Sequence, residues 1–269
     1  MTVRVPIHRL PTRRRTLTTW TGAAVLALLV PLTGCGGSDK DSGDNGGDRR
    51  TITVLAAASL TDAFEKGKAS FEKEHPDVRL RFSFAGSQEL AAQVRQGVPA
   101  DVLVTADQPT MDKLDKDTGT PKVIARNRLT IVTPKGNPEK VNSLKDLSRS
   151  GLKVVLGAPD VPVGNYARQV LKKERVNVKP ASEEANVRAV LSKVRLDEAD
   201  AGIVYVTDAH SAKGKVAEVA IPTEQNALAS YPAATLKNSK HPEQAREYTK
   251  WLSSAKGWRH LADQGFEKP

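Results

Sequence analysis

From residue 51 onward the chain alternates short apolar segments with segments of helical periodicity, and this alternation restricts its fold more than any other feature. In the first such pair, an apolar run extends from Ile52 to Ala58, and Leu60, Phe64 and Phe71 then recur at helical spacing. Strands that alternate with helices are typical of an α/β fold with a largely parallel sheet covered on both faces. The sequence therefore predicts an α/β protein.

The same alternation continues to the end of the chain. Further strands are expected at 78–84, 102–105, 128–133, 153–156, 201–206, 216–221 and 228–236. Helices are expected at 88–96, 109–116, 164–173, 187–194, 242–253 and 255–264. A turn-rich segment at 134–138 is a candidate crossover between two units.

Residues 1–35 have the features of an export signal. A basic segment precedes an apolar run at 22–32, which is far shorter than the ~20 apolar residues needed to span a bilayer. The run ends in Leu32-Thr33-Gly34-Cys35, which resembles the lipobox of bacterial lipoproteins. This resemblance implies cleavage before Cys35 and acylation of that cysteine.

Two other interpretations of the N-terminus stay open. The segment could be a plain secretory signal with an incidental cysteine, or Arg14-Arg15 could belong to a twin-arginine signal. Cys35 is the only cysteine in the chain, which excludes an internal disulfide and favours the lipid role.

The segment at 36–50 is rich in Gly, Ser, Asp and Asn, a composition that does not support a packed core. A flexible coil of this length spans about 20 Å, enough to hold a domain away from a membrane surface. We therefore expect a protein outside the cytoplasm, tethered to the outer face of the cell membrane by a lipid on Cys35.

The net charge of +10 does not indicate a nucleic-acid partner. The first 34 residues contain five arginines and no acidic residue, and without them the chain has 36 basic against 31 acidic residues. The remaining basic residues are scattered, and no aromatic residues alternate with them to form a stacking platform. We expect no nucleic-acid binding.

Several hydrogen-bond donors lie where strands meet helices. Ser59 and Ser87 each follow a strand and open a helix, and the segments at 161–166 and 184–188 open two more. The first turn of a helix presents unpaired N–H groups. Tyr205 lies near the end of a strand, at the edge where open α/β sheets bind ligands. Each of these residues alone is an ordinary cap or core residue.

Together, such donors suit a tetrahedral oxyanion that stays ionised. An anion that carries a proton would place a donor against a donor. An anion of the wrong size would leave buried N–H groups unpaired, at about 1 to 3 kcal/mol each. The pattern therefore predicts selection by charge state and by size.

Six sequence strings carry a family resemblance. They lie in order over about residues 51–266 and resemble the molybdate-binding proteins of bacterial ABC importers. The strings are Ala57-Ala58-Ser59-Leu60, Phe84-Ala85-Gly86-Ser87, Gly97-Val98-Pro99-Ala100-Asp101-Val102, Val161-Pro162-Val163-Gly164-Asn165-Tyr166-Ala167, Asn186-Val187-Arg188 and Ala199-Asp200-Ala201-Gly202-Ile203-Val204-Tyr205.

The resemblance implies a type II periplasmic-binding-protein fold, in which two α/β lobes with mostly parallel sheets enclose a ligand cleft. Residues 51–130 and 208–269 would form lobe 1, and residues 131–207 would form lobe 2. The implied function is capture of molybdate, and of tungstate, for a membrane permease. We expect a monomer. We also expect no cofactor or metal site, because the ligand would be bound as an oxyanion.

The resemblance also implies a set of donors. Ser59 and Ser87 would donate from their hydroxyl and main-chain N–H groups, Val163 and Val187 from the main chain, and Tyr205 from its hydroxyl. Val163 and Gln88 occupy positions where the family commonly has smaller residues. Arg188, beside these donors, is expected to be a surface charge or a helix contact.

Two alternatives remain. The ligand could be another tetrahedral oxyanion such as sulfate or phosphate, although no arginine occupies a donor position, which argues against phosphate. An exported enzyme is the other alternative. Its two S-x-x-K matches, at 70–73 and 253–256, lack companion motifs, and the five histidines have no metal-ligand spacing.

Overall fold

The computed structural model describes residues 49–269. The expected signal peptide at 1–35, the acylated Cys35 and most of the tether at 36–50 lie outside the described residues. Among the described residues, no helix has the length and apolar character required to cross a bilayer.

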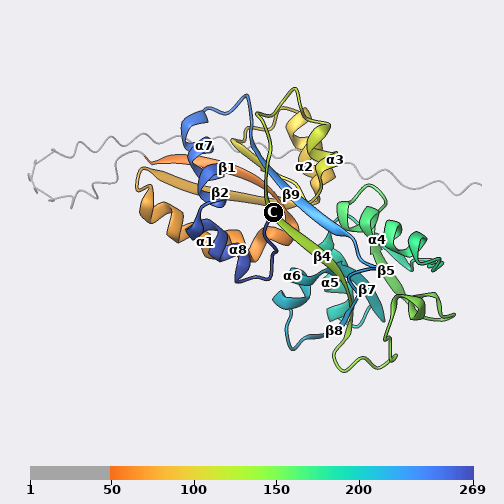
Figure 1. Ribbon diagram of the computed structural model, residues 1–269. Coiled ribbons are helices and arrows are strands. Elements are labelled where there is room, and N and C mark those ends of the chain that lie inside the picture. The colour runs from red at the N-terminus through yellow and green to blue at the C-terminus, as the bar shows by residue number, and fades with distance from the viewer. Residues whose placement is uncertain (1–48) are drawn as a thin grey trace, which may run out of the picture. The chain divides into compact units, whose positions relative to one another are not determined.

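The strands and helices alternate along the chain as expected (Figure 1). The strands are β1 (Arg50–Ala57), β2 (Val78–Ala85), β3 (Val102–Val104), β4 (Lys122–Pro134), β5 (Val154–Gly157), β6 (Ser182–Glu184), β7 (Ala201–Tyr205), β8 (Val216–Ala220) and β9 (Leu228–Thr235). The helices are α1 (Thr61–Glu74), α2 (Ser87–Arg95), α3 (Gln108–Asp112), α4 (Pro162–Lys173), α5 (Val187–Arg195), α6 (Val206–Ser211), α7 (Pro242–Leu252) and α8 (Ala255–Ala262). Two 3₁₀ turns complete the set, η1 (Ala58–Leu60) and η2 (Leu144–Ser148).

The strands form one sheet in the order β2-β1-β3-β9-β4-β7-β5-β6, with β8 also paired to β4. Strands β1, β2 and β3 are parallel to one another, and so are β5, β6 and β7. Strands β4 and β9 run antiparallel to their neighbours. Two parallel groups joined by antiparallel strands are consistent with the expected type II periplasmic-binding-protein fold.

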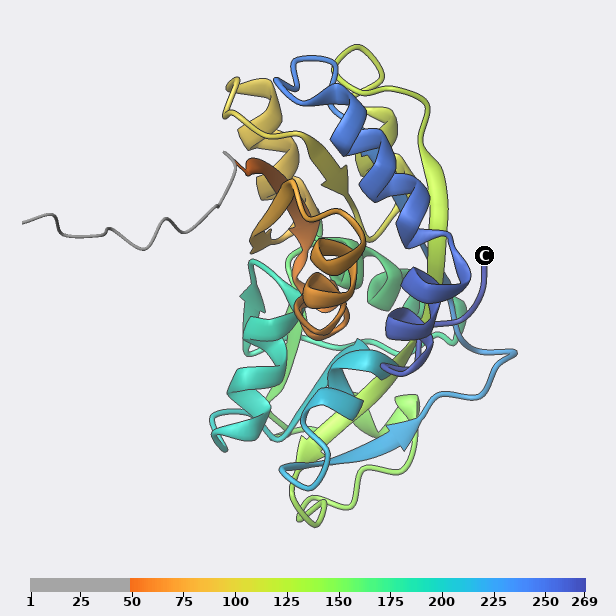
Figure 2. The ribbon, with the colours of Figure 1, turned by 90° about the vertical axis from the view of Figure 1, so that its left-hand side faces the viewer.

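Strand β4 belongs to both groups (Figures 1 and 2). Its residues 122–128 pair with β9, and its residues 129–132 pair with β7. We call β1–β3, β9 and the first part of β4, with α1–α3, α7 and α8, the first lobe. The second lobe consists of the rest of β4, β5–β8 and α4–α6. The strand thus passes from one lobe to the other near residue 128.

The pairing of β8 differs from the expected division of the chain. Residues 208–269 were all assigned to lobe 1, but β8 pairs with residues 130–134 of β4, within the second lobe. The pairing joins segments about 85 residues apart in the sequence, and the strand patterns by themselves do not indicate that β8 adds to the second half of β4. Helix α3 is also shorter than the expected 109–116, since it ends at Asp112.

An aromatic cluster joins α1 to the C-terminal helices of the first lobe. The ring of Phe71 on α1 lies 5.0 Å from that of Tyr248 and 5.5 Å from that of Trp251, both in edge-to-face geometry. Such pairs stabilise a core beyond the area that they bury. The tryptophan of α7 therefore packs in the core, with 7% of it exposed.

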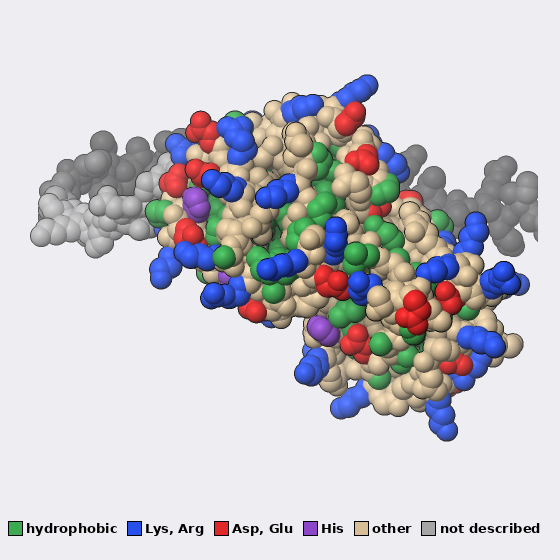
Figure 3. Space-filling view, in the orientation of Figure 1, with side chains coloured by type: hydrophobic (Ala, Val, Ile, Leu, Met, Phe, Trp, Pro, Cys, Tyr) green, Lys and Arg blue, Asp and Glu red, His purple; other side chains and the backbone are tan. Residues whose placement is uncertain are grey.

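Charge is spread over the surface. In Figure 3, Lys and Arg side chains are interspersed with Asp and Glu over the visible face of both lobes. This distribution matches the scatter of basic residues in the sequence.

The backbone approaches itself closely where β5 connects to α4, and this close approach yields the first prediction. A Cβ atom at Gly164 would lie 2.1 Å from the carbonyl oxygen of Ala158 and 2.2 Å from that of Gly157. We expect Gly164→Ala to lower the free energy of unfolding by roughly 1 to 3 kcal/mol, because the start of α4 must shift away from this backbone. Urea unfolding followed by circular dichroism measures the change.

Asn165→Ala is the matched control, because it alters the next residue of the same helix at an exposed position. Its effect should stay within about 0.5 kcal/mol. Equal stabilities of the Gly164→Ala variant and the unmodified protein would contradict the packing described for this turn.

Candidate functional site

The five predicted donors line one small cavity between the lobes. Its lining consists of Ala57, Ala58, Ser59, Ala85, Gly86, Ser87, Ala106, Val161, Pro162, Val163, Asn186, Val187 and Tyr205. Its volume is about 10 Å³, so any occupant must be small. None of these lining residues carries a charged side chain.

Parallel pairing explains why the two serines meet. Ala57 at the end of β1 pairs with Ala85 at the end of β2. Because the strands are parallel, both end at the same edge of the sheet, and the turns that follow them begin side by side. Ser59 lies in η1 and Ser87 is the first residue of α2, so both face this edge.

The second lobe brings two helix starts to the same place. Val163 is the second residue of α4 and Val187 is the first residue of α5. The Asn186 side chain caps α5 by accepting from the N–H of Ala189 at 3.0 Å. Because Val187 is the first residue of α5, its own N–H has no partner within the helix. Helix starts also carry a partial positive charge, so their convergence favours an anion.

Tyr205 closes the cavity with a donor that nothing in the described chain satisfies. Its side chain is 1% exposed, and its hydroxyl has no hydrogen-bond partner among residues 49–269. Burial raises the pKa of Tyr205 well above its usual value, so the phenol stays protonated. An unsatisfied buried hydroxyl costs about 1 to 3 kcal/mol, and its position therefore points to an acceptor supplied by a ligand.

Both serine hydroxyls already accept or share a hydrogen bond from the protein. Ser87 Oγ accepts from the N–H of Ala106 at 3.0 Å, so its own proton is free to be donated. Ser59 Oγ lies 2.9 Å from Tyr231 Oη. Neither serine Oγ is hydrogen-bonded to a histidine or carboxylate among the described residues, so neither is activated as a nucleophile.

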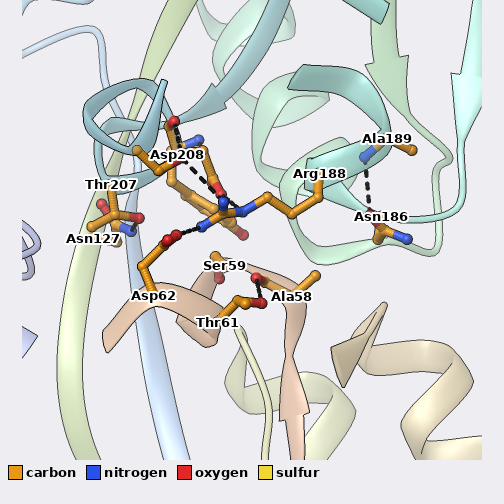
Figure 4. A network of polar contacts seen from close by, with 12 residues as sticks. Ala58, Ser59, Thr61, Asp62, Asn127, Asn186, Arg188, Ala189, Thr207 and Asp208 are labelled. Atoms are coloured by element: carbon orange, nitrogen blue, oxygen red, sulfur yellow. Dashed lines mark hydrogen bonds and ion pairs between the residues drawn. The ribbon is translucent and has the colours of Figure 1, made fainter. Parts of the chain in front are cut away.

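The lobes are joined beside the cavity by an ion-pair network around Arg188 (Figure 4). Arg188 on α5 of the second lobe places Nη2 2.5 Å from Asp62 Oδ2 on α1 of the first lobe. Its Nε lies 2.7 Å from Asp208 Oδ1 on α6. The pair with Asp62 bridges the two lobes and is possible only when they are close together.

Gln88 makes a second bridge between the lobes. Its Nε2 donates to the carbonyl oxygen of Ala185 at 2.8 Å. Gly86 lies under the same carbonyl, and a Cβ there would approach it to 2.4 Å. The larger residue noted at position 88 therefore reaches across the rim of the cavity.

Sequence reasoning did not assign a role to Asp62, Asp208 or Tyr231, and it expected Arg188 to be a surface charge or a helix contact. Its ion pair with Asp62 links residues that are 126 positions apart, and the bond between Ser59 and Tyr231 spans 172 positions. The only available signal was that Arg188 lies one residue after a predicted donor. Cys35, the predicted lipidation site, lies outside the described residues.

Comparison with known proteins gives a consistent result. Residues 52–267 match the family model described as bacterial extracellular solute-binding protein. The chain is 40% identical over 254 residues to the molybdate-binding protein ModA of Mycobacterium tuberculosis, covering 93% of this chain and 97% of that protein. It is 36% identical over 203 residues to the ModA of Escherichia coli, covering 70% and 78%.

A solved structure shares the fold. The periplasmic molybdate-binding protein of Azotobacter vinelandii superposes with a TM-score of 0.71 at 21% identity, covering 81% of this chain and 99% of that one. The expected two-lobed α/β fold is thereby confirmed.

The buried Asp208 yields a prediction on pH. Burial raises the pKa of Asp208 to about 6, although Arg188 and the N–H of Tyr205 oppose the rise. The folded-state pKa thus exceeds the unfolded value, so the stability that this carboxyl contributes is fully present below about pH 4 and is lost as the pH rises through 6. Asp208→Asn removes the titration. The stability of this variant relative to the unmodified protein should therefore rise by about 2 kcal/mol between pH 4 and pH 7.

Urea unfolding of both proteins at several pH values in this range measures the difference. A difference in unfolding free energy that does not change with pH would show that Asp208 does not titrate as described.

Proposed function

Because the chain belongs to the family of bacterial extracellular solute-binding proteins, we propose that it captures molybdate, and also tungstate, and delivers the anion to the membrane permease of an ABC importer. The family acts outside the cytoplasm and binds solutes without a cofactor. Its members are not enzymes, so the alternative of an exported enzyme is set aside. The observation that carries the proposal is the buried Tyr205 hydroxyl, which faces a cavity of unpaired donors.

The chemistry of the cavity supports a fully deprotonated tetrahedral oxyanion. Molybdate and tungstate bring only acceptors, which match the hydroxyls of Ser59, Ser87 and Tyr205 and the N–H groups of Val163 and Val187. Phosphate carries a proton at neutral pH and would set a donor against a donor. Sulfate brings no proton but is smaller, so it would leave some of the donors without a partner.

The mode of attachment is part of the proposal. We propose that residues 1–35 are removed, that Cys35 is acylated and that residues 36–50 tether the lobes to the outer face of the cell membrane. We retain the division into lobe 1 (51–130 and 208–269) and lobe 2 (131–207), with the change that residues 208–211 of α6 and 216–220 of β8 belong to the second lobe. The protein is proposed to act as a monomer.

Calorimetric titration of the full chain tests the ligand. We expect one-to-one binding of molybdate and of tungstate, with much weaker binding of sulfate and phosphate. Tyr205→Phe and Ser59→Ala should each weaken molybdate binding roughly 10- to 100-fold, because each removes a buried donor to a charged acceptor. Tyr248→Phe, at a buried tyrosine outside the cavity, should leave the affinity unchanged.

The outcomes separate the alternatives. Preferential binding of sulfate or phosphate would keep the site and reassign the ligand. If none of the four anions binds, the proposed function is wrong.

The bridge between Arg188 and Asp62 yields a prediction on closure. Because this ion pair forms only in the closed arrangement, Asp62→Asn should speed molybdate dissociation by a few-fold. The effect should stay below about tenfold, since both side chains are partly exposed and such pairs contribute about 1 kcal/mol or less. Stopped-flow dissociation, followed by intrinsic fluorescence, measures the rate.

Asp115→Asn is the control, because Asp115 is an exposed carboxylate of the first lobe whose side chain bridges nothing. The difference between the two variants should shrink at high salt. Equal dissociation rates for both would show that the pair does not hold the lobes together.

A further inference from the structure

A buried chain of polar side chains stands behind Ser59. Tyr231 Oη on β9 lies 2.9 Å from Ser59 Oγ and 3.5 Å from Asn127 Nδ2 on β4. The same Asn127 Nδ2 donates to Thr207 Oγ1 at 2.8 Å. Figure 4 shows Asn127 beside Thr207, close to the Arg188 network. All four side chains are buried, with exposed fractions between 0% and 3%.

The orientation of the Asn127 carboxamide is fixed by the backbone. Its Oδ1 accepts from the N–H of Arg128 at 3.0 Å. A backbone N–H can only donate, so the carboxamide oxygen must face Arg128 and the Nδ2 group must face Tyr231 and Thr207. Tyr231 therefore meets a donor on this side.

This orientation determines where the protons of the chain lie. Because Tyr231 Oη faces the NH₂ group of Asn127, it has no acceptor there and gives its proton to Ser59 Oγ. Burial raises the pKa of Tyr231 above its usual value, so the phenol keeps that proton. Ser59 Oγ then accepts from Tyr231, and its own proton points away from Tyr231, toward the cavity.

We propose that Asn127 and Tyr231 are positioning residues that fix Ser59 as a donor to the ligand and so specify a fully deprotonated anion. The inference rests on the proposed function, since it assigns the origin of selectivity at that same site. Ser87 needs no such chain, because the N–H of Ala106 fixes its direction from the backbone. Ser59 is thus the one of the two serines whose direction depends on distant side chains.

Asn127→Asp tests the proposal because it should reverse the direction of the hydrogen bond between Tyr231 and Ser59. One carboxylate oxygen can still accept from the N–H of Arg128, while the other now faces the hydroxyls of Thr207 and Tyr231 and can accept a proton from each. Tyr231 must then accept from Ser59, and lone pairs rather than a proton face the ligand. We expect the affinity of the full chain for molybdate to fall at least tenfold.

A double-mutant cycle separates this inversion from the effect of the added charge. Tyr231→Phe alone should weaken molybdate binding less than threefold, because the Ser59 hydroxyl can still turn to the ligand. In the Tyr231→Phe background, Asn127→Asp adds the same charge, but no Tyr231 hydroxyl is present whose hydrogen bond to Ser59 could reverse. The effect of Asn127→Asp on the molybdate affinity should therefore be at least fivefold smaller in this background. An equal effect of Asn127→Asp in both backgrounds would overturn the proposal.

A second readout uses two anions of similar size. At about pH 8 sulfate and hydrogen phosphate are both dianions, and only hydrogen phosphate carries a proton. Competition against molybdate at millimolar concentration should show that Asn127→Asp raises the affinity for hydrogen phosphate relative to sulfate at least fivefold. A merely structural role of Asn127 would change the affinities for both anions in the same proportion, and that result would also overturn the proposal.

A third readout needs no ligand. Asn127→Asp leaves a buried carboxylate that Tyr231 can satisfy, so its effect on the unfolding equilibrium should be at least tenfold larger in the Tyr231→Phe background. Equal effects in both backgrounds would show that the Tyr231 hydroxyl does not interact with the side chain at position 127. If this readout holds while no oxyanion binds, the proposed function fails and the hydrogen-bond chain stands.

Discussion

A hydrogen-bond donor that is buried without an acceptor destabilises a protein, and the cavity between the lobes gathers several such donors. The hydroxyl of Tyr205 and the first-turn N–H groups of α4 and α5 all face it, with no charged side chain among them. The neighbouring structure holds these donors in place. Parallel strands end together, short turns open helices, and ion pairs at the rim hold the two lobes against each other.

The direction of the strands brings these donors together. Parallel strands in each lobe end at the cleft, so every helix that follows one of them begins there. The antiparallel strand β4 then joins the lobes, and none of its residues lines the cavity. An anion held in this way interacts with dipoles and hydroxyls instead of opposite charges, and recognition then depends on the geometry and protonation state of the ligand.

Local patterns in the sequence were sufficient for the fold class and for the residues that line the cavity. Alternating strands and helices predicted the α/β architecture, and the family strings placed Ser59, Ser87, Val163, Val187 and Tyr205, which lie together in the structure. Those strings are local, since each covers one strand end or one helix start. Pairing between distant segments was beyond the same reasoning. The partnership of β8 with β4, the ion pair of Arg188 with Asp62 and the contact of Tyr231 with Ser59 each join segments that no periodicity relates.

The position of β4 gives the site an order of assembly. Tyr231 and Ser59 belong to the first lobe, and Asn127 lies at the point where β4 leaves it, so the direction of the Ser59 hydroxyl is set whether or not the lobes are closed. The N–H groups of α4 and α5 arrive only with the second lobe. Under the proposed function, an approaching anion would first meet the hydroxyls of the first lobe, and the N–H groups of the second lobe would enclose it afterwards.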